Sequence, residues 1–426
     1  MRLALFILAA AIAAAASASA QVPDLGGAIG GVVGPTPAGE LGEVTQGLGE
    51  QVGQGLRDLR EEQTRLLSRR HSDVIDLDRA GFPFIRNEVV AVAPSAAALE
   101  SARARGFVVS ETVDAQGLGL TLIVLRAPEG MSTRRALATL REIDPEGAYD
   151  YNHVYLGAGI VDAAPSVSTQ QPRGGGGGGA RIGLIDSGVA TTHPALADAS
   201  IRQRGFAGPQ AVGDVHGTAV ASLLLAADSD APTIYVADVY GGLPTGGGAS
   251  AIVSALSWLA QSGAGVINIS LVGPPNRALE AGVRAAIARG HIIVAAVGND
   301  GPSAPPLYPA SYPGVIGVTG VDANNRALPE AGRGDQVDFA APGSDLAAAT
   351  TTGGFAPVRG TSFAAPIVAG LIARRLPSPS ADAAASAQTQ LAHTAADLGA
   401  RGRDRTFGIG LVGEDVRASS RQLARR

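Results

Sequence analysis

The chain has 426 residues, a formal net charge of −5, 46% hydrophobic residues and 17% charged residues. This length allows roughly two or three domains with one extensive core, and the small negative charge gives no electrostatic bias toward nucleic acid. Cysteine and lysine are both absent, which excludes thiol catalysis, disulfides, thiolate metal sites and mechanisms that need a lysine amine. The six histidines remain as bases that can act near neutral pH.

The first twenty residues, 1–20, are typical of a secretory signal peptide. Arg2 precedes an apolar run, Leu3 to Ala16, and the small residues before Gln21 suit cleavage there. The run is short for a membrane span, and no later stretch is long and apolar enough to be one. We therefore expect export to a periplasm or to the extracellular space, with no membrane span after signal removal.

Residues 21–50 are rich in glycine, proline and alanine without a period, and this composition predicts disorder. From about Gln51 to Arg70, leucine and valine recur near helical spacing among arginine and glutamate, which predicts an amphipathic helix. We expect this helix to pack on its own domain rather than on a membrane.

The region 51–171 continues as a small α+β pattern. Strands are expected at 88–92, 107–111 and 118–125, helices at 96–105 and 133–142, and extended chain at 148–156. The order β-α-β-β-α-β is that of a ferredoxin-like domain. The chain then reaches the six glycines Gly174 to Gly179, so residues 172–180 are predicted to be a flexible linker at a domain boundary.

In residues 181–416, short apolar strands alternate with helices. Strands are expected at 181–185, 234–239, 266–271, 292–297, 315–318 and 337–340, and helices at 215–226, 252–259, 276–289, 363–373 and 381–396. This alternation predicts an α/β, doubly wound fold whose mostly parallel sheet has helices on both faces. Active sites in such sheets gather at the carboxyl ends of the strands. The arginine-rich residues 417–426 are predicted to be a solvated tail.

Two titratable side chains fall at positions suited to catalysis. Asp186 directly follows the strand 181–185 and precedes the turn at Gly188. His216 opens a helix, and that position is expected to lower its pKa and keep the imidazole neutral as a base. Each residue alone also has an ordinary structural explanation, as a cap or as a core residue.

Two further polar residues complete the set. Asn299 follows the strand 292–297 and offers an amide donor, although it is also a normal turn residue. Ser362 comes after a glycine at the start of an apolar helix, where unpaired N–H groups favour negative charge. Pro366 fits only near the start of that helix. A simple helix cap would also explain the serine.

Together these segments resemble the subtilase family of serine endopeptidases. The resemblance is carried by Ile185-Asp186-Ser187-Gly188, His216-Gly217-Thr218 and Gly360-Thr361-Ser362, in that chain order. It extends from about residue 181 to 412 and includes Ile267 to Leu271, which is similar to the family's substrate-binding edge strand. The sequence departs from the family at Ala219, where many subtilases have a second histidine, and at Asp300, where Glu or Ser is usual.

The resemblance implies that Ser362 is the nucleophile, that His216 is the general base and acid, and that Asp186 orients the imidazole. Asn299 and the backbone N–H of Ser362 would form the oxyanion hole. The other residues expected to bind substrate, as an added strand or as a small apolar wall, are Ser270, Leu271, Val272, Gly273, Ala296 and Gly298. His193, the other histidine close to Asp186 in sequence, is expected to be structural.

The domain at 51–171 resembles, by position and element order, the inhibitory propeptide of subtilases. We expect its exit segment to occupy the cleft and to be cut by the enzyme itself between Asn152 and Ala180. The alternative is an accessory domain that is never removed.

No acidic loop of the calcium-binding kind is visible, so we expect no metal and no cofactor to be required, although calcium is frequent in the family. The expected partners are a protein or peptide substrate and the chain's own propeptide, without nucleic acid, and the expected state is a monomer. The alternative to an endopeptidase is an exported binding or scaffold protein that has the subtilase fold but no proteolysis. Ester hydrolysis could accompany peptidase activity at the same site.

Overall fold

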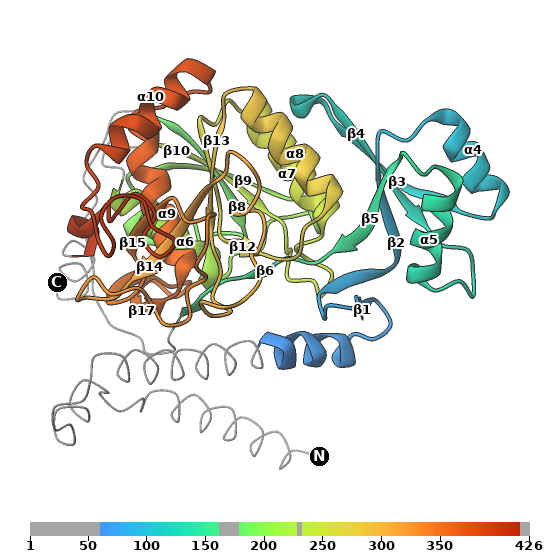
Figure 1. The fold of residues 1–426 in the computed structure, drawn as a ribbon, viewed down its shortest axis with the longest axis horizontal. Coiled ribbons are helices and arrows are strands. Elements are labelled where there is room, and N and C mark those ends of the chain that lie inside the picture. The colour runs from blue at the N-terminus through green and yellow to red at the C-terminus, as the bar shows by residue number, and fades with distance from the viewer. Residues whose placement is uncertain (1–59, 162–178, 228–231, 418–426) are drawn as a thin grey trace, which may run out of the picture. The chain divides into compact units, whose positions relative to one another are not determined.

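The structure is a computed structural model that describes residues 60–161, 179–227 and 232–417 (Figure 1). The expected signal peptide, the segment 21–50, the first part of the amphipathic helix, most of the linker and nearly all of the tail lie outside the described residues. Residues 60–70 of the expected amphipathic helix are helical. No helix in the described ranges is long and apolar enough to cross a membrane.

From β2 onward, the chain up to residue 153 forms the predicted β-α-β-β-α-β order, and a short strand, β1, precedes it. Its elements are β1 (Ile75–Leu77), β2 (Pro83–Val92), α4 (Ala96–Ala104), β3 (Val108–Ala115), the short η1 (Gln116–Leu118), β4 (Leu120–Arg126), α5 (Thr133–Ile143) and β5 (Ala148–His153). The antiparallel sheet has the order β1-β2-β4-β3, with β5 also on β2. Serine side chains cap both helices, since Ser95 accepts from Ala98 N–H and Ser132 from Arg135 N–H. Strand β1 gave no signal in the sequence.

A second sheet has seven strands in the order β15-β14-β13-β11-β8-β10-β9, and every pairing in it is parallel. The strands are β8 (Arg181–Asp186), β9 (Ser200–Gly205), β10 (Thr233–Asp238), β11 (Val266–Ile269), β13 (Ile292–Ala296), β14 (Ile316–Val321) and β15 (Phe339–Pro342). All residues of β11, β13 and β14 are buried, as expected for a parallel sheet covered on both faces. The predicted fold class is confirmed.

Helices cover this sheet on both faces. They are α6 (Val215–Ala227), α7 (Ala249–Gln261), α8 (Arg277–Ala288), α9 (Thr361–Ala373) and α10 (Ala381–Ala392), with the short η2 (Pro194–Leu196). Alternate strand residues point to opposite faces, so Leu184 belongs to the buried cluster of α6 and α9 while Ile185 belongs to that of α7 and α8. Within each pair the two helices pack side by side (Figure 1).

Two small antiparallel sheets join the chain that leaves β5 to the rest of the molecule. One pairs β6 (Leu156–Gly157) with β12 (Leu271–Val272), and the other has the order β16-β17-β7, formed by β16 (Leu346–Ala349), β17 (Phe355–Arg359) and β7 (Ile160–Val161). The strand expected at 266–271 is therefore divided into β11 and β12. The segment 154–161 therefore contributes one strand to each small sheet, β6 to the first and β7 to the second.

Strand β5 supplies caps to two helices of the larger sheet. The N-cap of α7 is Gly248, which has no side chain, and Asn152 Oδ1 accepts from the N–H of Ser250 at 3.1 Å instead. Asp150 Oδ2 accepts from the N–H of Arg277, the first residue of α8, at 3.1 Å. Both side chains satisfy N–H groups that a helix end leaves unpaired. The described residues all lie within one compact unit.

Asn276 is the N-cap of α8, as the sequence predicts. It is buried, its Oδ1 accepts from the N–H groups of Ala278 and Leu279, and its Nδ2 donates to Tyr151 O at 2.9 Å. Asn276→Ala is therefore expected to lower the free energy of unfolding by about 1–2 kcal/mol. The measurement is urea denaturation in a Ser362→Ala chain.

The control is Ser380→Ala at the N-terminus of α10. Ser380 accepts a single cap hydrogen bond of 3.4 Å from Ala383 N–H at an exposed position. We expect a loss of at most about 0.5 kcal/mol there. Equal losses for the two variants would contradict the role given to the buried asparagine.

Candidate active site

The fold brings Asp186 and His216 into direct contact. Asp186 is the last residue of β8 and is fully buried, and His216 is the second residue of α6. His216 Nδ1 lies 2.8 Å from Asp186 Oδ1 and 3.1 Å from Oδ2. Because a carboxylate only accepts, Nδ1 carries the proton and donates it. Nε2 is thereby left as the basic nitrogen of the neutral ring.

The pKa of His216 moves in the direction opposite to the one expected from its helix position. Burial lowers this pKa, but the charge of Asp186, its hydrogen bond to the ring and the charge of Asp214 raise it, and the result lies above the usual value. The expectation of a lowered pKa is therefore wrong, because the helix position alone leaves out the buried carboxylate beside Nδ1.

Ser362 is the second residue of α9 and is fully buried. Its hydroxyl donates to the carbonyl oxygen of Ser270 at 3.0 Å. Within the described part of the chain, the buried Nε2 of His216 has no hydrogen-bond partner. The ring of His216 nevertheless lies 5.5 Å, centroid to centroid, from that of Phe363, the residue after Ser362. To use His216 as its base, the serine hydroxyl must turn away from Ser270.

Pro366 lies inside α9, beyond the helix start where the sequence led us to expect it. A proline has no N–H to donate to the carbonyl four residues earlier, which here is that of Ser362. Ser270 Oγ donates to this carbonyl at 2.9 Å instead. Asn268 Nδ2 in turn donates to Ser270 Oγ at 2.9 Å, so a buried chain of hydrogen bonds holds the start of the helix.

Asn299 and the backbone N–H of Ser362 converge on one oxygen atom. The carbonyl oxygen of Ala158 accepts from Asn299 Nδ2 at 2.5 Å and from the N–H of Ser362 at 3.1 Å. The amide of Asn299 is oriented by its other end, because Asn299 Oδ1 accepts from the N–H of Thr361 at 3.1 Å. These are the two donors that were expected to form the oxyanion hole.

Gly360 makes this close approach possible. Its φ of 134° is in a region that favours glycine. A Cβ at this position would lie 2.8 Å from the carbonyl oxygen of Ala158 and 2.9 Å from Asn299 Nδ2. A side chain at Gly360 would therefore collide with the group that the two donors hold.

The residues around Ala158 are extended and pair with neighbouring strands on both sides. On the N-terminal side, Leu156 pairs with Val272 and Gly157 with Leu271, and the N–H of Ala158 points to Ser270 O at 3.4 Å. On the C-terminal side, Val161 pairs with Val358 of β17. The exit segment of the N-terminal domain is thus paired with β12 before Ala158 and with β17 after it.

Three of the expected substrate-binding residues, Gly273, Gly298 and Ala296, make no strand pairing with the described part of this segment. Gly273 pairs with Tyr308, but a Cβ on Gly273 would lie 2.6 Å from the ring of the buried Tyr155. Gly298 donates its N–H to Thr361 Oγ1 at 3.2 Å. Ala296 is buried in the core at the end of β13. Substrate binding by Ser270, Leu271, Val272, Gly273, Ala296 and Gly298 stays a prediction.

The two departures from the expected family pattern have different surroundings. Ala219 is buried within α6. Asp300, next to Asn299, forms an ion pair with Arg60, whose Nε lies 2.5 Å from Asp300 Oδ2. No local sequence pattern predicts this ion pair, since the two residues are far apart in the chain.

His193 is not part of the hydrogen-bonded pair of Asp186 and His216. It is buried, its Nδ1 accepts from the N–H of Ala195 at 3.0 Å, and its Nε2 lies 2.9 Å from the carbonyl oxygen of Gly354. Both ring nitrogens are used by backbone groups, which agrees with the structural role expected for it.

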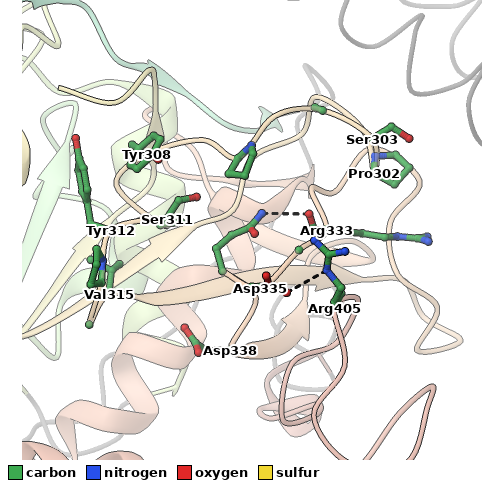
Figure 2. A pocket seen from close by; sticks show the side chains of 17 residues that line it. Pro302, Ser303, Tyr308, Ser311, Tyr312, Val315, Arg333, Asp335, Asp338 and Arg405 are labelled. Carbon is green, nitrogen blue, oxygen red and sulfur yellow. Dashed lines mark hydrogen bonds and ion pairs between the residues drawn. The ribbon is translucent and has the colours of Figure 1, made fainter.

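A separate pocket of about 610 Å³ lies beside the loop 302–315 and holds none of the four candidate catalytic residues (Figure 2). Its ion pair, Arg405 with Asp335 at 3.1 Å, is largely exposed. No cluster of three or more histidine or acidic side chains that could hold a metal occurs in the described ranges. The expectation that no metal or cofactor is required stays a prediction.

Asp186 contacts His216, and two N–H donors meet at one carbonyl oxygen beside Ser362 at the start of a helix, an arrangement that suits acyl-transfer chemistry. The sequence model of the subtilase family matches residues 177–410 of this chain. The chain therefore belongs to the subtilase family and is a subtilisin-type serine peptidase.

Individual relatives agree with this assignment. Subtilisin DY from Bacillus licheniformis is 33% identical over 243 residues, which cover 54% of this chain and 88% of that protein. Thermitase from Thermoactinomyces vulgaris is 34% identical over 207 residues, covering 46% and 74%. Fervidolysin from Fervidobacterium pennivorans, a keratinolytic enzyme related to subtilisin, has the same fold, with a TM-score of 0.64 and 20% identity over 81% of this chain and 63% of its own.

Asp186→Asn is expected to lower peptide hydrolysis by about 10⁴-fold, because an asparagine does not hold His216 in the required tautomer. His216 is a base only when it is neutral, so activity rises with pH through its pKa. Removing the carboxylate that raises this pKa should move the acid limb to lower pH. The measurement is kcat/KM against pH, on enzyme matured in trans by the wild type.

The control is Asp382→Asn, at an exposed position in the first turn of α10. It should leave both the rate and the acid limb unchanged. An acid limb that stays in place in Asp186→Asn would contradict the link between the two residues.

Proposed function

We propose that the chain is an exported serine endopeptidase that is made with an N-terminal propeptide and cuts its own chain between Ala158 and Gly159. The observation that carries this proposal is the carbonyl oxygen of Ala158, which accepts from both Asn299 Nδ2 and the N–H of Ser362. Donors placed in this way stabilise the negative charge that develops on a carbonyl oxygen under attack. The proposed bond lies within the range from Asn152 to Ala180 expected from the sequence.

In the proposed reaction, His216 Nε2 takes the proton from Ser362 Oγ, and this oxygen attacks the carbonyl carbon of Ala158. Asn299 Nδ2 and the N–H of Ser362 hold the resulting oxyanion. His216 then gives its proton to the nitrogen of Gly159, and the bond from Ala158 to Gly159 breaks. Ala158 is left as an ester of Ser362, and Asp186 stabilises the charged imidazole while it exists.

Water completes the reaction. His216 takes a proton from a water molecule, which attacks the ester carbonyl, and the proton returns to Ser362 Oγ. One product ends at the carboxylate of Ala158 and the other begins at the amine of Gly159. The same steps would hydrolyse other peptides that pair with β12, which is the endopeptidase activity that we propose for the matured enzyme.

The propeptide in this proposal is the domain that ends at Ala158. Its β5 caps α7 and α8, and its β6 pairs with β12, so it would be an intramolecular inhibitor before the cut and would stay bound as a separate chain after it. The proposal of export rests on residues 1–20, whose sequence is typical of a signal peptide.

Wild-type chain made in an exporting host is expected to yield a product that begins at Gly159, because the bond before it lies at the two donors. Ser362→Ala should keep the whole propeptide. Asn299→Ala should mature about 10²–10³-fold more slowly, since it loses one oxyanion donor. The measurements are intact-mass spectrometry of the products and labelling of Ser362 by a fluorophosphonate.

The matched control is Ser386→Ala, an exposed serine in α10, which should mature like the wild type. A Ser362→Ala chain cut at the same bond would sink the idea of self-processing. A matured chain that never labels would instead favour the binding or scaffold alternative.

A further inference from the structure

Gly159, the residue after the bond assigned above, lies against the ring of Phe363. A Cβ added to Gly159 would lie 2.5 Å from Cε2, 3.1 Å from Cζ and 3.2 Å from Cδ2 of that ring. The backbone of Gly159 is not in the left-handed region, so an L-residue could adopt its conformation. The missing side chain is therefore required by the space that Phe363 fills.

Phe363 has little freedom to give way. It is fully buried and belongs to the hydrophobic cluster on the face of α6 and α9. It follows Ser362 directly and lies against the ring of His216. Moving the phenyl ring to accept a side chain would disturb both the packed cluster and the neighbours of the reacting atoms.

Gly157, on the other side of Ala158, has a different environment. A Cβ there would lie 3.4 Å from His216 Nε2, which is a normal contact distance, and Gly157 is exposed. The cleft thus has room for a side chain two residues before Gly159 but not at Gly159 itself. Because the two glycines flank the same residue, one serves as the control for the other.

We propose that Phe363 acts as a specificity-determining residue that restricts the position after the cleaved bond to glycine. This inference rests on the proposed cut between Ala158 and Gly159 and extends it to other substrates. The enzyme then selects proteins and peptides in which the residue at the position of Ala158 is followed by glycine.

The test compares three peptides on the matured wild-type enzyme. The first is Tyr-Leu-Gly-Ala-Gly-Ile-Val, the sequence of residues 155–161, the second has alanine in place of the glycine that corresponds to Gly159, and the third has alanine at the position of Gly157. Relative to the first peptide, we expect kcat/KM to fall by about 10–200-fold for the second, the range for one methyl group that a pocket has to reject. The third should be cut within about threefold of the first, since ordinary contact distances cost little.

The second arm uses Phe363→Ala and Phe363→Leu enzymes with the first two peptides. Each variant gives a ratio of two kcat/KM values, so a general loss of activity cancels. The ratio should fall toward one in both variants. If neither variant matures, the rates of self-processing of Gly159→Ala and Gly157→Ala precursors give the same comparison, with only the Gly159→Ala precursor slowed.

The outcomes separate this inference from the proposed function. If the first two peptides are cut at equal rates at the bond that follows the residue corresponding to Ala158, the glycine restriction is overturned and the proposed cut remains intact. A restriction that persists unchanged in both Phe363 variants would overturn the role of Phe363. Failure to cut the first peptide between its alanine and glycine would overturn both proposals.

Discussion

The two hydrogen bonds to the carbonyl oxygen of Ala158 are the constraint around which the cleft is arranged. One donor is a side chain beyond the end of β13, and the other is a backbone N–H at the start of α9. They can meet only if Gly360 leaves room for the carbonyl and if Thr361 holds the amide of Asn299 in one orientation. The peptide group of Ala158 is thereby held in one position, and the residues on its two sides are kept extended by pairing with β12 and β17.

The parallel sheet explains why residues so distant in sequence meet there. Asp186 ends β8, and Asn299 follows β13 at the same edge of the sheet. Strand β11 lies between these two strands. After it, the carbonyl oxygen of Ser270 accepts a hydrogen bond from the Ser362 hydroxyl, and β12 pairs with β6. Asp186, Ser270 and Ser362 are buried, so water does not compete for their hydrogen bonds, and these bonds hold the side chains in one arrangement.

Local sequence was sufficient for the fold class and for the positions of the candidate catalytic residues. Apolar strands of β11, β13 and β14 stand out because both of their faces are buried. Strand β9 gave no such signal, since Arg202, Gln203 and Arg204 are exposed on the edge of the sheet. The direction of the pKa of His216, the ion pair of Asp300 and the position of Ala158 depend on contacts between distant residues, and no local pattern encodes them.

Among the described residues, the two sides of Ala158 are held unequally, and this difference would set the order in which the products leave after the proposed cut. The C-terminal side is held by the two register pairs of β7 with β17. The N-terminal side is held by β6, by the buried Tyr155 and by the caps that β5 gives to α7 and α8. The new amine would therefore withdraw first, while the severed domain lingers as a competitor for the cleft. Bond cleavage and the appearance of activity would then be separate events, the second timed by dissociation.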